Sequence, residues 1–120
     1  MILADTSIWV QHFRRGLPEF SAALDHGRIS IHPVVLGELA SGNLANRAET
    51  LADLQRLPGV KAARTEECLH FIEAHVLYGR GIGWNDIQLL VAATLSHHQL
   101  WSRDARLAAA AAALHIAYLV

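Results

Sequence analysis

The sequence predicts a helix-rich α/β protein: a three-layer α/β/α sandwich around a short, mainly parallel central sheet. Short apolar runs alternate with longer stretches of helical periodicity, a pattern typical of parallel strands joined by helices. The length of 120 residues suits one hydrophobic core. Hydrophobic residues make up 52% of the chain and charged residues 18%, which excludes a disordered protein. No repeat or linker is visible, so we expect a single domain over residues 1–120.

The first half of the chain is expected to contain two strands and four helices. A short apolar run, Ile2 to Ala4, meets Asp5, Thr6 and Ser7, three residues suited to cap a helix. Glycines and prolines separate the segments that follow, because they end or open helices. The expected order is a strand over 2–4, a helix that follows these cap residues and is broken at 16–18, a helix over 19–26, a strand over 29–31, and helices over 33–40 and 43–57.

The second half alternates in the same way. The segment 85–96 is apolar on nearly every side, which predicts a central and buried helix. The segment 66–77 carries an apolar stripe in which Leu69 and Val76 are expected to face inward. The full expected order is a short strand over 60–63, a helix over 66–77, a loop over 79–83, a helix over 85–96, a strand over 100–102, a helix from 104 and a strand over 116–120.

Two aspartates follow predicted strands. Asp5 comes directly after the first strand, and Asp104 lies two residues beyond the segment 100–102. In parallel α/β sheets, ligands bind beyond the carboxyl ends of the strands, so we expect both carboxylates at the functional edge. The alternative is that each aspartate only caps the helix that follows it.

Two further acids stand on helices in unusual surroundings. Glu38 shares a helix face with Val34 and Val35, which predicts that it points toward the apolar side. Alternatively, Glu38 is partly exposed at a helix edge or paired with an arginine. Asp86 lies in the first turn of the most apolar helix, where it could also act only as a partner of the helix dipole.

Together, these four carboxylates predict a bound cation, because their mutual repulsion would otherwise oppose their gathering at one sheet edge. Hard oxygen ligands without cysteine favour Mg²⁺, with Mn²⁺ as a substitute. Such an ion binds phosphate oxygens and lowers the pKa of a bound water, so phosphodiester hydrolysis is the expected reaction.

Five arginines are candidates to hold a phosphate backbone beside this site. They are Arg14, Arg15, Arg80, Arg103 and Arg106, and the last two bracket the fourth acid. For any one of them the alternative is an ordinary solvated side chain.

Composition excludes several other classes of protein. The net charge of −1 excludes a polybasic nucleic-acid binder, and no apolar run reaches the ~20 residues of a membrane span. Cys68 is the only cysteine, which excludes an intrachain disulfide and a cysteine zinc cage. A cytoplasmic protein without a secretion signal is therefore expected. The apolar surplus predicts a protein partner or a self-interface.

Four motifs that contain these acids occur in a known order. They are LADTSIW at 3–9, GELA at 37–40, GRGIGWND at 79–86 and LWSRD at 100–104. In this order and over essentially the whole chain, the sequence resembles a PIN-domain ribonuclease, specifically a VapC-type toxin of a bacterial toxin–antitoxin pair.

The resemblance assigns the four acids, Asp5, Glu38, Asp86 and Asp104, to one or two Mg²⁺ or Mn²⁺ ions and to orienting the attacking water. It assigns supporting hydroxyls to Thr6, or alternatively Ser7, and to Ser102, where the family commonly has threonine. Gln88 stands where related toxins often carry histidine.

The resemblance also implies a substrate and partners. It implies cleavage of structured RNA, either tRNA or a ribosomal RNA loop, that leaves a 5′-phosphate and a 3′-hydroxyl. It implies a homodimer that is inhibited by a cognate VapB antitoxin.

Two other interpretations remain open at this point. One is a non-catalytic PIN-like module that binds RNA or protein. The other is a receiver domain or a haloacid-dehalogenase-like phosphatase, which would also place an aspartate and Mg²⁺ at a strand end. Against the second, Ser7 stands where the phosphatase pattern has aspartate, and the only lysine, Lys61, lies outside all four motifs.

Overall fold

A small parallel sheet forms the centre of the protein. The computed structural model describes residues 1–120 and has strand order β2-β1-β3. In the register of the sheet, Leu3 lies opposite Ser30 on one side and Leu100 on the other. The three residues are buried, in agreement with strands that are apolar except for Ser30 and Gln99. The strands are β1 (Ile2–Ala4), β2 (Ile29–Ser30) and β3 (Gln99–Trp101).

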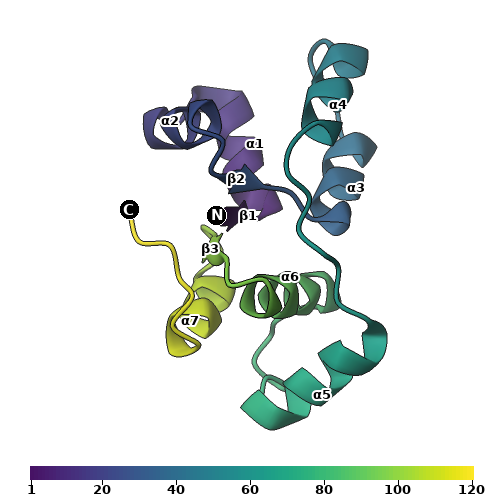
Figure 1. Ribbon diagram of the computed structural model, residues 1–120, viewed down its shortest axis with the longest axis vertical. Coiled ribbons are helices and arrows are strands. Elements are labelled where there is room, and N and C mark those ends of the chain that lie inside the picture. The colour runs from purple at the N-terminus through teal and green to yellow at the C-terminus, as the bar shows by residue number, and fades with distance from the viewer.

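Seven helices surround this sheet, and α/β alternation with parallel pairing is confirmed. Figure 1 shows α1 and α2 on one side of the strands and α6 and α7 on the other, with α3 and α4 side by side and α5 beyond α6. None of the helices is long and apolar enough to span a membrane. The helices are α1 (Thr6–Arg15), α2 (Pro18–Asp25), α3 (Pro33–Ser41), α4 (Arg47–Gln55), α5 (Thr65–His75), α6 (Trp84–Leu95) and α7 (Ala105–Ala113).

Three helices begin at side chains that accept backbone hydrogen bonds. The Asp5 carboxylate accepts from the N–H of Ile8 at 3.2 Å at the start of α1. His32 Nδ1 accepts from the N–H of Val34 at 2.9 Å at the start of α3. The Asp104 carboxylate accepts from two backbone N–H groups of α7, at 2.9 and 3.1 Å. Asp5 and Asp104 are therefore helix caps, and this role fixes where their carboxylates point.

The core lies between the sheet and the helices. Helix α6 is central as predicted, with six buried residues between Ile87 and Ala93. On the other side of the sheet, the ring of Phe20 packs 4.7 Å from that of Trp9 and 5.6 Å from that of Trp101. These contacts fix α1 and α2 against the end of β3, directly before Ser102 and Asp104 of the fourth acidic motif.

Three expected elements differ in the structure. Residues 60–63 form no strand, since only Gly59 bridges to Ile31 after the Pro58 turn and the segment that follows is largely exposed. Residues 116–120 also form no strand beyond one bridge, Leu100 to Ala117, because the chain end is solvent-exposed. Helix α4 begins at Arg47 rather than at residue 43, because Asn46 has a left-handed backbone with φ of 50°.

The expectation that Leu69 and Val76 face inward is wrong. Their side chains are 54% and 49% exposed. Helix α5 packs against α6 and presents its other side to solvent. Val76 has φ of 51°, so α5 ends at His75 and the chain turns before the buried Leu77.

Candidate functional site

The carboxylate of Asp5 lies at the carboxyl end of β1 and is the most buried of the four acids, at 4% exposure. Its backbone N–H donates to the carbonyl of Trp101 at 3.0 Å, which ties the ends of β1 and β3 together. Ser7 Oγ donates to Asp5 Oδ1 at 2.5 Å, and Ser102 Oγ donates to Asp5 Oδ2 in a short hydrogen bond. Both carboxylate oxygens are therefore held by hydroxyl groups from different elements.

Asp104 lies on the same edge and shares a hydrogen-bond partner with Asp5. Its backbone N–H donates to Ser102 Oγ at 3.0 Å, so one hydroxyl links both acids. The structure thus brings together two aspartates that are 99 residues apart in the chain, as expected from strands of parallel direction.

Glu38 reaches the site from α3, but it is exposed, and the prediction that it points toward the apolar side is wrong. The buried residues of α3 are Val35 and Leu39, so the apolar stripe runs beside Glu38 rather than through it. Thr6 Oγ1 donates to Glu38 Oε1 at 3.0 Å. This hydrogen bond orients the Glu38 carboxylate toward the start of α1.

Asp86 is half-buried in the first turn of α6. Burial raises the pKa of its carboxyl from 3.8 to about 6, and the negative charges of Asp5, Asp104 and Glu38 contribute to this rise. The charges of all three other acids therefore act on Asp86, which supports placing it in the same region as Asp5, Glu38 and Asp104.

No basic side chain neutralises this region. The protein has two ion pairs, Arg56 with Asp53 and Arg64 with Glu67, and neither involves the four acids. The structure contains no group of three or more His, Cys, Asp or Glu side chains close enough to hold a metal ion. In donor chemistry, however, four carboxylates with adjacent hydroxyls and no paired cation fit a hard divalent ion.

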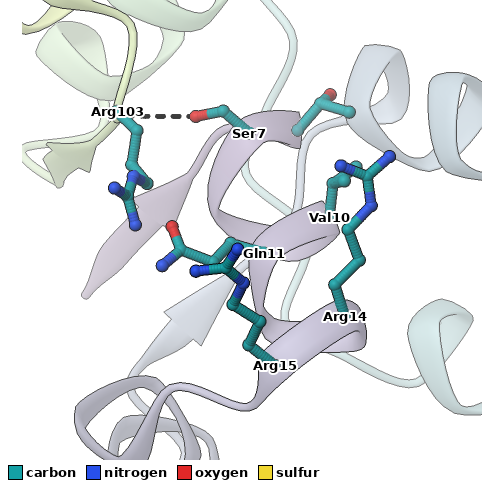
Figure 2. Close-up of a pocket in the computed structure, with 7 residues that line it drawn as sticks. Ser7, Val10, Gln11, Arg14, Arg15 and Arg103 are labelled. Atoms are coloured by element: carbon teal, nitrogen blue, oxygen red, sulfur yellow. Dashed lines mark hydrogen bonds between the residues drawn. The ribbon is translucent and has the colours of Figure 1, made fainter.

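The candidate arginines divide into two groups. Arg14, Arg15 and Arg103 line one pocket beside Thr6 and Ser7, as Figure 2 shows. The other two candidates, Arg80 and Arg106, are also exposed but do not line this pocket.

The guanidinium of Arg106 lies directly over Gly81 in the 79–83 loop. A Cβ added at Gly81 would stand 2.5 Å from Arg106 Nη1, and Gly81 has φ of +74°. Arg106 therefore packs against the loop that leads into the helix of Asp86, and only glycine allows this approach.

We expect Gly81→Ala to lower the free energy of unfolding by about 1–2 kcal/mol, because alanine is strained at this φ and must displace Arg106. Gly37→Ala is the matched control, since a Cβ there meets nothing within 4 Å in the middle of α3. That change should be neutral or stabilising by up to about 1 kcal/mol. Urea denaturation of both variants measures the difference, and equal stabilities would show that the Arg106 contact is unimportant.

The sequence pointed to Ser7 only as an alternative supporting hydroxyl, and it did not point to His32 as a contributor to the site. Ser7 accepts the N–H of Arg103 at 3.1 Å while it donates to Asp5, a double role visible only once α1 and the loop after β3 are adjacent. His32 begins α3 and so places Glu38; its burial lowers the pKa of the imidazole. The signal for both was position alone, because Ser7 lies within the first acidic motif and His32 follows the second strand.

Comparison with known proteins agrees with this architecture. Residues 2–113 match the family model of the PIN domain. Two relatives, both named Ribonuclease VapC32 and from Mycobacterium tuberculosis strains CDC 1551 / Oshkosh and ATCC 25618 / H37Rv, are each 36% identical over 113 residues. The match covers 93% of this chain and 91% of each relative. The chain therefore belongs to the PIN domain family and is similar to its VapC-type ribonucleases.

Proposed function

We propose that this protein is a metal-dependent endoribonuclease and the toxin of a type II toxin–antitoxin pair. The observation that carries the proposal is the link between Asp5 and Asp104 through the Ser102 hydroxyl, with Glu38 held by Thr6 at the start of α1 and no basic side chain paired to any of the four acids. Family membership and the names of the relatives support RNA as the substrate.

Asp5, Glu38, Asp86 and Asp104 are the proposed ligands of Mg²⁺, or of Mn²⁺ in its place. When bound, such an ion offsets the carboxylate charge, lowers the pKa of a water nucleophile and stabilises charge on the leaving oxygen. Among the protein's own residues, Ser7 and Ser102 hold the Asp5 carboxylate, and Thr6 holds that of Glu38.

Hydrolysis of the P–O3′ bond by water is the proposed reaction, and it leaves a 5′-phosphate and a 3′-hydroxyl. The proposed substrate is a structured RNA, either tRNA or a ribosomal RNA loop. Exposed arginines near the site, Arg14, Arg15, Arg80, Arg103 and Arg106, are proposed to contact its backbone.

The proposed partners are a VapB antitoxin, which inhibits the enzyme, and a second copy of the chain. Large apolar side chains are exposed on α5, on α6 and in the turn between them, which supports a self-interface or an antitoxin interface there. They are Leu69, Val76, Tyr78, Trp84 and Leu95. Light scattering on the antitoxin-free protein tests the homodimer, for which a mass of twice 13.1 kDa is expected.

Cleavage of end-labelled tRNA and ribosomal RNA in Mg²⁺, Mn²⁺ or EDTA tests the catalytic proposal. We expect discrete cuts with either metal and none in EDTA. Asp104→Asn should reduce the rate at least 100-fold, because asparagine keeps the α7 cap but removes the charge. Metal-independent cuts, or an Asp104→Asn variant as fast as the wild type, would contradict the proposal.

The second candidate function is a non-catalytic module that binds RNA or protein. The absence of a closely spaced metal-ligand group favours it. Calorimetry with Mn²⁺ separates the two: the nuclease must bind the ion, whereas heat of dilution alone, together with intact RNA in every lane, would establish the module.

A further inference from the structure

A pocket of about 510 Å³ opens beside Thr6 and Ser7, between α1 and the loop after β3. Its only apolar residue is Val10, and it contains no aromatic ring. Figure 2 shows the side chains of Arg103, Gln11 and Arg15 on one side of α1 and those of Val10 and Arg14 on the other. The lining residues are Thr6, Ser7, Val10, Gln11, Arg14, Arg15 and Arg103.

This pocket shares a wall with the acidic site. Ser7 Oγ donates to Asp5 Oδ1 at 2.5 Å and accepts the backbone N–H of Arg103 at 3.1 Å. Thr6, which also lines the pocket, donates to Glu38 at 3.0 Å. The lining of the pocket is therefore connected to the carboxylates of Asp5 and Glu38 by one hydroxyl each.

The charge of the pocket is opposite to that of the acidic site. Its three guanidinium groups come from two elements, are exposed, and take part in neither of the protein's two ion pairs. No aspartate or glutamate lines it. Carboxylates that favour a bound cation thus lie near guanidinium groups that favour a bound anion. This arrangement suits a polyanion that binds at both places along its backbone.

We propose that Arg14, Arg15 and Arg103 form a subsite for an RNA phosphate adjacent to the scissile one, a proposal that rests on the proposed ribonuclease function. The pocket volume is in the range of small-ligand sites and suits about one nucleotide. Because no aromatic side chain is present to stack on a base, the subsite binds the phosphate backbone independently of the base sequence. The Gln11 amide is placed to hydrogen-bond the ribose.

Binding measured in EDTA tests this subsite without any cleavage. The probe is a labelled total tRNA pool, and filter binding gives log Kd against log salt concentration. Each of Arg14→Gln, Arg15→Gln and Arg103→Gln is expected to reduce the slope by about 0.7–0.9 and to weaken binding about fivefold at 0.1 M salt. Arg103→Gln keeps the backbone N–H that bonds to Ser7, so the acidic site remains held.

Arg64→Gln is the matched control, because it removes the same charge from an exposed position at the start of α5, a helix that lies beyond α6 in Figure 1. It should retain the wild-type slope. If the three pocket variants also retain that slope, the subsite is overturned even where the wild type cleaves RNA. If the wild type binds with the predicted arginine dependence but cuts nothing in Mg²⁺, the subsite stands and the nuclease proposal fails.

Discussion

Asp86→Asn is expected to abolish RNA cleavage and, without metal, to make the protein more stable at pH 7. Cleavage should fall at least 1,000-fold, because the variant loses a proposed metal ligand. The gain in stability follows from the burial of the charged Asp86 carboxylate and, to a smaller extent, from its repulsion by Asp5, Asp104 and Glu38. Its carboxyl has a pKa near 6, whereas an unfolded aspartate titrates near 3.8.

The sign of the pH dependence follows from this raised pKa. Between about pH 4 and pH 6 the folded state binds more protons than the unfolded state, so wild-type stability falls as pH rises through that interval. The shift corresponds to about 3 kcal/mol, and solvent screening of a half-exposed group reduces this to about 1–2 kcal/mol. Asparagine has no such penalty, so the advantage of the variant should grow from near zero at pH 4 to its full value at pH 7.

Urea denaturation in EDTA at pH 4.5, 5.5 and 7 measures this advantage. Asp53→Asn is the matched control, because Asp53 is an exposed acid on α4 paired only with Arg56. The control should cleave RNA as the wild type does and show no stabilisation. An Asp86→Asn variant that is less stable than the wild type at pH 7 would contradict the expectation that the charged form of Asp86 destabilises the fold.

Much of the fold could be predicted because local patterns coincide with burial. The uniformly apolar segments became the buried strands and α6, and polar cap residues mark the starts of α1 and α7. The wrong predictions concern segments whose structure depends on tertiary contacts rather than on the local sequence. The apolar segment 116–120 does not extend the sheet because nothing packs over Leu119 and Val120. Val76 continues a helical pattern, but its left-handed backbone ends the helix.

At the candidate site, the sequence located the acids better than it described their surroundings. Asp5 and Asp104 meet because parallel strands end at one edge, a rule that needs no coordinates. The exposure of Glu38 depends on how α3 rotates against α1, which a spacing of three or four residues cannot determine. The hydrogen bonds of Ser7 and Ser102 depend on side-chain directions across elements that are distant in sequence.

Ser102→Ala is the second change with a large expected effect. Its hydroxyl donates to Asp5 Oδ2 and accepts the backbone N–H of Asp104 at 3.0 Å. Removing it leaves an oxygen of a buried carboxylate without a partner, which should lower the free energy of unfolding by about 1–3 kcal/mol. Cleavage should fall about 10- to 100-fold, as for groups that orient metal ligands.

A merely structural role and a positioning role predict different results for this variant. If Ser102 positions Asp5, the Mg²⁺ concentration for half-maximal cleavage must rise in Ser102→Ala and return toward the wild-type value in Ser102→Thr, which restores the hydroxyl. Ser41→Ala is the control, because its exposed hydroxyl bonds only to the carbonyl of Gly37 in its own helix. Loss of stability with an unchanged Mg²⁺ requirement would mean that Ser102 stabilises the fold but does not position Asp5.

Because Ser7 holds the other oxygen of the same carboxylate, the double variant Ser7→Ala/Ser102→Ala should lose more activity than the two single losses predict.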